Sequence, residues 1–277
     1  MRGAPSVQTV IERQDSGGVV KLKMARDVPG PIRYHTSCYW VDGLLIDTGC
    51  AHCSREFQRA TGDLPLSQVV NTHCHEDHIG NNGRCQARGA TIQAHALALP
   101  YLADPRTLKL HPYRHVFWGT PRPSTAAPIG KTVATEHHEF QVIPTPGHSP
   151  DHIALYEPRM GWLFTGDAYV GGRDRALRAG FNIHQIIASL KKLAELPAAR
   201  LFPASGSVVP NPAAALASKI AYLEETGQKV MALHAQGQSP SQIRHALFGR
   251  EMAIAYVTLG DFSGVNLVRS YLADLPA

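Results

Sequence analysis

Residues 72 to 78 constrain the fold of this chain more than any other segment. They place three histidines and one aspartate within six residues, directly after an apolar strand pattern. In extended backbone, residues two positions apart face the same side, so His73 and His75 can reach one ion. A following turn brings Asp77 and His78 to a neighbouring position. Imidazole and carboxylate ligands suit zinc, manganese or iron, so the segment predicts a metal site at the end of a strand.

Two later turns present further side chains of the same kind. His148 follows a Pro-Gly pair behind a predicted strand, and Asp167 follows a Thr-Gly pair at the end of another. A histidine after Pro-Gly, or an aspartate after glycine, is by itself an ordinary turn residue. In combination with the first cluster, these two residues supply the further ligands that complete a metal site.

The hydrophobic pattern predicts hairpin strands first and then a mixture of strands and helices. The predicted strands are Val7–Ile11, Val19–Met24, Cys38–Val41, Leu44–Ile46, Val69–Val70, Thr91–Ala94, Phe140–Ile143, Ile153–Tyr156 and Trp162–Phe164. The predicted helices are Ser54–Ala60, a segment around Cys85, Ile183–Leu196 behind the cap Asn182, Ala214–Thr226, Val230–Ala235, Ser241–Phe248 and Leu267–Leu272.

Two longer stretches set the domain organisation. Residues 104 to 128 contain five prolines and no regular period, so they predict a long ordered loop or lid. The chain from residue 211 onward is predicted to be almost entirely helical. We therefore expect one domain at residues 1–210, which contains the ligand-type residues, and a helical C-terminal subdomain at residues 211–277.

Composition narrows the classes of protein that fit. The chain has 277 residues, of which 44% are hydrophobic and 18% charged, which is typical of a globular protein with one sizeable core. The net charge of +5 is spread without a basic run, so nucleic-acid binding is not indicated. No apolar stretch is long enough to span a membrane, and no secretory signal is visible, so we expect a cytoplasmic protein. Five cysteines without framework spacing predict reduced thiols.

Taken together, the motifs resemble those of the metallo-β-lactamase superfamily. The matching segments are Thr72–His78, Gly147–Ser149 and Gly166–Ala168, preceded by Leu45–Gly49. The resemblance covers about residues 30 to 210. It implies an α/β fold, a four-layer αβ/βα sandwich of two mixed sheets with helices outside and the metals at one edge, here followed by a helical C-terminal appendage.

The resemblance also implies a role for each ligand-type residue. It assigns one ion to His73, His75 and His148, and a second ion to Asp77, His78 and Asp167, with Asp167 bridging the two. Asp47 and His152 are expected to orient these ligands through hydrogen bonds and not to bind an ion.

The chain departs from the family pattern at one position. Ser205 stands where the family carries its last histidine ligand, and a hydroxyl is a far poorer ligand than imidazole. His52, His137 and His184 are the candidates to replace it, and nothing in the sequence favours one of them. We therefore expect one or two zinc ions, with iron or manganese as alternatives.

By resemblance to the glyoxalase II-like and lactonase-like branches, the expected activity is hydrolysis. Metal-bound hydroxide would attack the carbonyl of an ester, thioester or lactone, and Asp77 would relay a proton to the leaving group. The expected partner is a small-molecule substrate, and the helical tail is compatible with a homodimer.

Three alternatives remain open at the level of sequence. The first is a mononuclear iron enzyme, because His73, His148 and Asp167 form a possible two-histidine, one-carboxylate site like that of the family's persulfide dioxygenases. The second is a nuclease, which the incomplete second site and the absence of a basic run disfavour. The third is a non-catalytic metal-binding protein, supported only by Ser205.

Overall fold

A hairpin-rich sheet forms the N-terminal half of the molecule. The computed structural model describes residues 9–26 and 34–273. In these residues the first sheet has the order β1-β2-β3-β4-β5-β6-β7, antiparallel up to β4 and parallel from there on. Its strands are β1 (Thr9–Asp15), β2 (Val20–Arg26), β3 (Thr36–Val41), β4 (Leu44–Ile46), β5 (Gln68–Val70), β6 (Thr91–Ala94) and β7 (Ala127–Pro128). Asp42 and Gly43 both have positive φ and form the two-residue turn between β3 and β4, the geometry that matches strand twist.

The second sheet has the order β13-β11-β10-β9-β8. Its strands are β8 (Thr132–Ala134), β9 (Glu139–Pro144), β10 (Ile153–Glu157), β11 (Trp162–Gly166) and β13 (Arg200–Pro203). Only β11 and β13 are parallel, and helix α5 (Ile183–Ala194) lies in the connection between them. Every residue of β10 and β11 is buried, because these central strands are covered on both faces.

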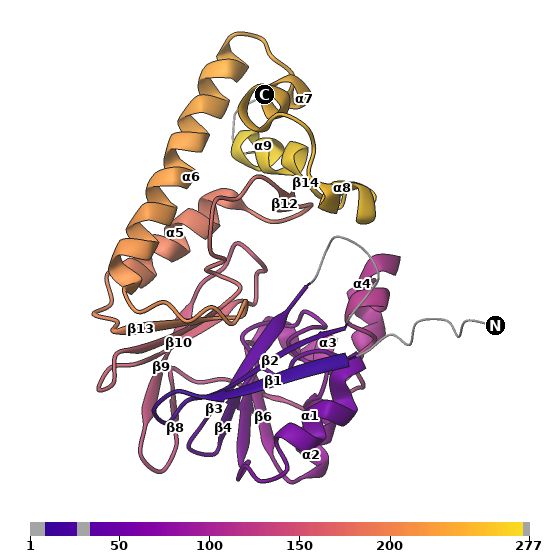
Figure 1. Cartoon of the computed structure of the whole chain (residues 1–277), viewed down its shortest axis with the longest axis vertical. Helices are drawn as coiled ribbons and strands as arrows, with labels where there is room; N and C mark the ends of the chain where they lie inside the picture. The colour runs from indigo at the N-terminus through magenta and orange to yellow at the C-terminus, as the bar shows by residue number, and fades with distance from the viewer. Residues whose placement is uncertain (1–8, 27–33, 274–277) are drawn as a thin grey trace, which may run out of the picture.

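The two sheets pack face to face, with helices on the outer sides (Figure 1). Phe164 and Phe202 of the second sheet stack with ring centroids 4.7 Å apart, and Tyr39 of the first sheet packs edge-on against both, 5.5 Å from each. The outer face of the first sheet is covered by η1 (Ala51–Cys53), α1 (Ser54–Ala60), α2 (Asn82–Ala87), η2 (Ala96–Ala98), α3 (Leu99–Ala103), η3 (Pro105–Leu108) and α4 (Pro112–Phe117). The predicted αβ/βα sandwich is confirmed.

The C-terminal helices extend the layer that covers the second sheet. They are α6 (Pro212–Ala235), α7 (Pro240–Phe248), α8 (Ala253–Val257) and α9 (Gly264–Leu272). Buried side chains of α6, α7 and α9 form one hydrophobic cluster with α5 and the second sheet. A short ladder between β12 (Leu177–Arg178) and β14 (Phe262–Ser263) also ties the end of the chain to the segment between β11 and α5. The division at residue 210 stays a prediction.

Two predictions about the elements are wrong. Residues 214–226 and 230–235 belong to one helix, α6, which continues through Gly227. A Cβ at Gly227 would lie 2.9 Å from the ring of Tyr271, so this glycine permits close packing of α9 and does not end the helix. Residues 104–128 are not a continuous loop, because Pro112 begins the helix α4, where proline suits the first turn.

Several short elements were not predicted from the sequence, among them β7, β8, β12, β13, β14, α3 and α8. The predicted strand Val7–Ile11 begins outside the described residues, and its described part belongs to β1. Within the described residues, no helix combines the length and the apolar character that crossing a membrane requires.

Candidate metal centre

The ligand-type side chains lie where strands of both sheets end. The loop with the histidine cluster follows β5, His148 follows β9, and Asp167 follows β11. Because β9 and β11 both run antiparallel to β10, their carboxyl ends lie at the same edge of the second sheet. The backbone N–H of Ile153, at the start of β10, donates to the carbonyl of Thr72 and joins this edge to the histidine loop.

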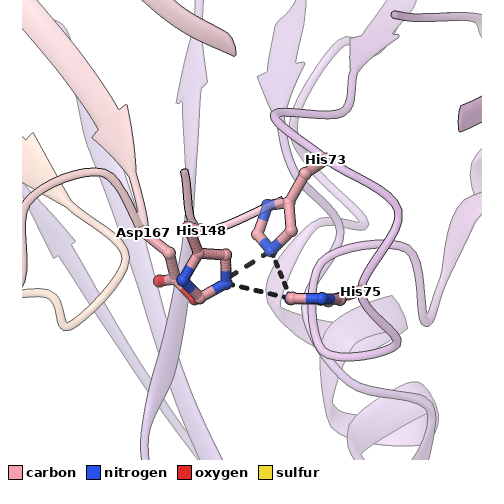
Figure 2. A group of neighbouring side chains, drawn as sticks. All are labelled: His73, His75, His148 and Asp167. Atoms are coloured by element: carbon pink, nitrogen blue, oxygen red, sulfur yellow. Dashed lines mark hydrogen bonds and ion pairs between the residues drawn. The ribbon is translucent and has the colours of Figure 1, made fainter. Parts of the chain in front are cut away.

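Four side chains converge at this edge to form the first group (Figure 2). One ligand-type atom from each of His73, His75, His148 and Asp167 lies within 4.8 Å of the others. The Nδ1 atom of His75 lies 2.8 Å from Nε2 of His73 and 2.9 Å from Nε2 of His148. Asp167 Oδ2 lies 3.2 Å from Nε2 of His148. Three imidazole nitrogens and one carboxylate oxygen aimed at one point are the donor set of a tetrahedral zinc-type site.

A second group shares Asp167 with the first. It consists of Asp77, His78 and Asp167, and Nε2 of His78 lies 3.5 Å from both Asp77 Oδ2 and Asp167 Oδ2. This Nε2 atom is buried and has no hydrogen-bond partner. An orphaned buried nitrogen facing two carboxylates fits a site whose missing partner is a cation. The structure therefore places the two predicted groups side by side, with Asp167 common to both.

Burial sets the protonation of the first group. It lowers the pKa of His148 to about 4 and lowers the pKa values of His73 and His75 well below the ordinary histidine value. These rings are therefore neutral near pH 7, which leaves lone pairs free to bind an ion. For Asp167, burial alone would raise the pKa, but the neighbouring histidines, His78 first, lower it. The carboxylate is thus ionised.

His78 behaves differently because it faces carboxylates. Burial alone would lower its pKa, but Asp47, Asp77 and Asp167 together raise it well above the ordinary value. Without a cation the ring itself carries the positive charge that these carboxylates need. A metal ion in the second group would take over that role and displace the proton from Nε2.

Asp47 forms hydrogen bonds to the histidine loop. One carboxylate oxygen accepts from the backbone N–H of Thr72 at 2.7 Å. The other accepts from the Thr72 hydroxyl at 2.8 Å and lies 2.8 Å from Nδ1 of His78. Asp47 has a φ of 60°, a left-handed conformation that is uncommon outside glycine and asparagine or aspartate. The carboxylate fixes which nitrogen of His78 faces the site.

His152 has a similar supporting position. Its Nε2 accepts from the backbone N–H of Asp167 at 3.1 Å, and its Nδ1 lies 2.7 Å from the hydroxyl of Thr145. The side chain is buried and does not belong to either ligand group. It therefore positions the loop that carries Asp167.

Ser205 follows β13 and lines the same cavity as the ligand groups. The structure places the three histidines considered as its replacement elsewhere. His52 contacts Arg26 and the carbonyl of His115, His137 contacts Asp42, and His184 lies 3.2 Å from the carbonyl of Tyr271. In the described residues, no histidine besides His78 joins the second ligand group.

Sequence reasoning missed one ion pair beside the motif. Glu76 lies within the histidine loop but belongs to neither ligand group, and Arg114 of α4 donates to its buried carboxylate at 2.5 Å. Burial raises the pKa of Glu76 to about 7, against the opposing effect of Arg114. The only signal in the sequence was an acidic residue inside a buried loop, because its partner lies 38 positions away.

A cavity of about 370 Å³ opens over the ligand groups. Its floor includes His75, His148, Asp77 and Asp167. The other walls come from α4, from the segment between β11 and α5, and from α8 and β14. The C-terminal part of the chain thus takes part in shaping the site. A volume of this size suits a small-molecule ligand.

Comparison with known proteins agrees with this geometry. The sequence profile of the family described as "Metallo-beta-lactamase superfamily" matches residues 32–205. This fold, with ligand groups at the shared edge of two sheets, defines a class of metal-binding αβ/βα sandwich proteins. The chain belongs to the metallo-β-lactamase superfamily.

Individual relatives are more distant. The chain is 31% identical over 134 residues to a hydroxyacylglutathione hydrolase from Synechococcus, covering 48% of this chain and 46% of that protein. It is 24% identical over 208 residues to a beta-lactamase-like protein 2 homolog from Drosophila melanogaster, covering 70% of this chain and 64% of that protein. The chain therefore spans less than two thirds of the length of these curated relatives.

Similar folds extend over nearly the whole chain. A metallo-beta-lactamase family protein from Thermus thermophilus superposes with a TM-score of 0.70 at 17% identity, covering 93% of each chain. A beta-lactamase domain protein from Burkholderia ambifaria gives the same TM-score at 18% identity, covering 95% of this chain and 89% of that one. At these identities the likeness shows the fold alone.

Proposed function

We propose that this protein is a metal-dependent hydrolase of an ester, thioester or lactone carbonyl. The observation that carries the proposal is the convergence of His73 Nε2, His75 Nδ1 and His148 Nε2 beside Asp167 on the floor of a cavity. The similarity to hydroxyacylglutathione hydrolases supports a carbonyl substrate, since that name describes cleavage of an acyl-glutathione bond.

The donor set limits the ions that fit to a few divalent metals. His73, His75, His148 and Asp167 would hold the first ion, and Asp77, His78 and Asp167 a second. When bound, a divalent ion supplies a Lewis acid for the carbonyl and lowers the pKa of a water ligand to about 7. We propose zinc as the ion, because three imidazoles and one carboxylate suit it, although iron and manganese accept the same ligands.

The protein side chains perform the remaining tasks. Asp77 lies on the cavity floor with its carboxylate 15% exposed. When the second group holds no ion, Asp77 can accept a proton from the attacking water and return it to the leaving group. Asp47 and His152 hold His78 and Asp167 in place through buried hydrogen bonds. The apolar residues Leu177 and Phe181 line the wall of the cavity and limit the access of bulk water.

The test combines metal content with a substrate panel. We would purify the protein without added metal, measure zinc, iron and manganese per chain by mass spectrometry, and assay thioester, ester and lactone hydrolysis. Bound zinc with hydrolysis of one substrate class, lost on chelation and restored by zinc, is expected. Bound iron with oxygen consumption and no hydrolysis would overturn the proposal in favour of the dioxygenase alternative.

A further inference from the structure

Arg178 places a cation beside the candidate metal centre. It lies in β12, lines the cavity, and has a side chain only 17% exposed. Its Nη1 atom lies 3.4 Å from Nε2 of His75, and its guanidinium carbon lies 5.8 Å from the ring centre of Phe181. No sequence motif marks Arg178, and the proposed hydrolysis as derived above does not use it.

His75 and Arg178 both present hydrogen-bond donors at this point. The Nδ1 atom of His75 faces the other two histidines of the first group. When Nδ1 gives its lone pair to an ion, the neutral ring must carry its proton on Nε2. Since a guanidinium has no acceptor, the Nε2–H and the Nη1–H cannot bond to each other. This step rests on the proposed metal site.

Two other histidines of the ligand groups have an oxygen beside their second ring nitrogen. Nδ1 of His73 lies 3.1 Å from the hydroxyl of Thr72, and Nδ1 of His78 lies 2.8 Å from the carboxylate of Asp47. Metal-binding histidines usually donate their second N–H to such an oxygen. His75 instead faces a cation. An oxygen that accepts from both His75 and Arg178 would complete the pattern.

Asp261 fixes the direction in which Arg178 points. Its carboxylate, 5% exposed, accepts from Nε of Arg178 at 3.1 Å and from the hydroxyl of Tyr113 at 2.8 Å. Its backbone carbonyl accepts from Ala179 at 2.8 Å. One aspartate before β14 therefore joins α4 to the segment that carries Arg178. Because Asp261 occupies the Nε edge, it holds the guanidinium with Nη1 toward His75.

The charge and polarity of the cavity agree with an anionic ligand that has an apolar body. Arginines 114, 173, 175 and 178 and Lys219 line it, and so do three aspartates. Glu76 and Asp261 pair with Arg114 and Arg178 and offset their charge, so an ion in the floor would make the cavity positive. Phe181, Leu177, Phe262 and Ile254 provide apolar wall. We propose that Arg178 and the Nε2–H of His75 form a binding site for an anionic oxygen, and that the substrate is an acyl compound carrying a carboxylate.

A binding experiment tests the anion site without requiring turnover. Calorimetric titration of the zinc-loaded protein with hexanoate and with hexanamide compares a carboxylate with a neutral amide of equal length. Arg178→Gln is expected to weaken hexanoate binding about tenfold and to leave hexanamide binding within twofold. Equal hexanoate affinity in both proteins would overturn the proposal, because it would show that the metal alone holds the carboxylate.

Two matched esters then separate a substrate carboxylate from the oxyanion of the reacting carbonyl. With p-nitrophenyl hydrogen adipate and p-nitrophenyl hexanoate, Arg178→Gln is expected to raise KM about tenfold for the acidic ester only. An equal loss of kcat for both esters would assign Arg178 to the reacting carbonyl and overturn the substrate-carboxylate proposal. If wild-type protein cleaves neither ester, the hydrolase proposal fails for such esters, and the calorimetry still decides the anion site.

Two further variants guard against loss of folding. Arg106→Gln makes the same chemical change at an exposed arginine that pairs with Asp104 and does not line the cavity, and wild-type binding is expected. Arg178→Lys retains the charge and is expected to retain part of the hexanoate affinity. Metal content measured in every variant shows whether the floor of the cavity is intact, and loss of hexanoate affinity at full metal content supports the proposal.

Discussion

At the scale of single residues, the site depends on which groups lie beside its buried imidazole nitrogens. In the first ligand group, burial keeps the imidazoles neutral, and in the second, three carboxylates keep His78 charged until a cation arrives. Removing one ligand from such a group leaves the others without a common partner. Metal retention is therefore the most direct measurement of the assignment.

We expect His75→Ala and His148→Ala each to lose the first ion and activity. Each variant removes one of three converging imidazole nitrogens, and affinity depends on all of them. Metal content by mass spectrometry after dialysis checks the loss. His234→Ala, on the exposed face of α6, is the control and should retain wild-type metal content. Full metal content in either site variant would contradict the assignment.

Ser205→His tests the departure from the family pattern. Ser205 lines the cavity, next to Ala204, whose backbone N–H bonds to the carbonyl of Gly166 at the end of β11. An imidazole here is expected to raise metal occupancy toward two ions per chain, because it adds the ligand that serine cannot supply. Metal content per chain, measured by mass spectrometry at equal zinc concentration for the variant and the wild type, checks this prediction. Unchanged occupancy would mean that position 205 does not face the second group.

At the scale of elements, the close approach of α5 to the turn after β9 sets the position of His148. Gly147 has a φ of 129°, and a Cβ there would lie 2.5 Å from the backbone nitrogen of Ile186. The carbonyl of Gly147 also accepts from Asn182, the residue that caps α5. The turn and the helix are therefore one packed unit that presents His148 to the metal group.

We predict that Gly147→Ala lowers the free energy of unfolding by roughly 2–4 kcal/mol, since it adds a backbone clash to an unfavourable φ. It should also weaken metal binding, because relief of the clash moves His148. Urea unfolding and zinc titration measure the two effects. Gly237→Ala is the matched control, with a φ of 80° and no atom within 4 Å, and should cost only about 1 kcal/mol. Equal losses in the two variants would show that packing against α5 is unimportant.

At the scale of the whole molecule, distant segments converge on one edge. The floor of the cavity comes from loops of both sheets, and its walls come from α4 and from the C-terminal helices. Many ionisable groups are thereby buried together, and their shared burial makes the stability of the metal-free protein depend on pH.

We predict that the metal-free protein becomes less stable as pH falls from 7 to 5. His73, His75, His148 and His152 have lowered pKa values in the fold, so in this range they bind protons mainly when the chain unfolds. His78 and Glu76 have raised pKa values and act in the opposite direction. Because the four histidines outnumber these two groups, the free energy of unfolding is expected to fall by roughly 1–3 kcal/mol for each pH unit. Urea unfolding at several pH values after chelation measures it, and constant or rising stability would contradict it.

The predicted ligand-type residues each follow a strand within a short local motif, and the structure brings them together at one edge, while their roles as ligands stay a prediction. The positions of β4, α1 and β6 were also predicted to the residue, since strand and helix periods are local properties. Two-residue strands such as β12 and β14 were not predicted, because they are too short to show a hydrophobic period and form only by pairing with each other. The sequence did not predict that α6 continues through Gly227. This glycine is needed for close packing against Tyr271, a contact that the local sequence does not reveal.

The sequence by itself determined the superfamily and the layered α/β architecture, and it predicted a set of metal-binding side chains that the structure brings together. Only the tertiary structure decided that Arg114 pairs with Glu76, that Asp261 directs Arg178 toward His75, and that His52, His137 and His184 lie elsewhere. The physical reason is the distance along the chain between the interacting residues. Backbone periods and turns depend on neighbours along the chain, whereas ion pairs and cavity walls depend on which distant segments the packing of two sheets brings together.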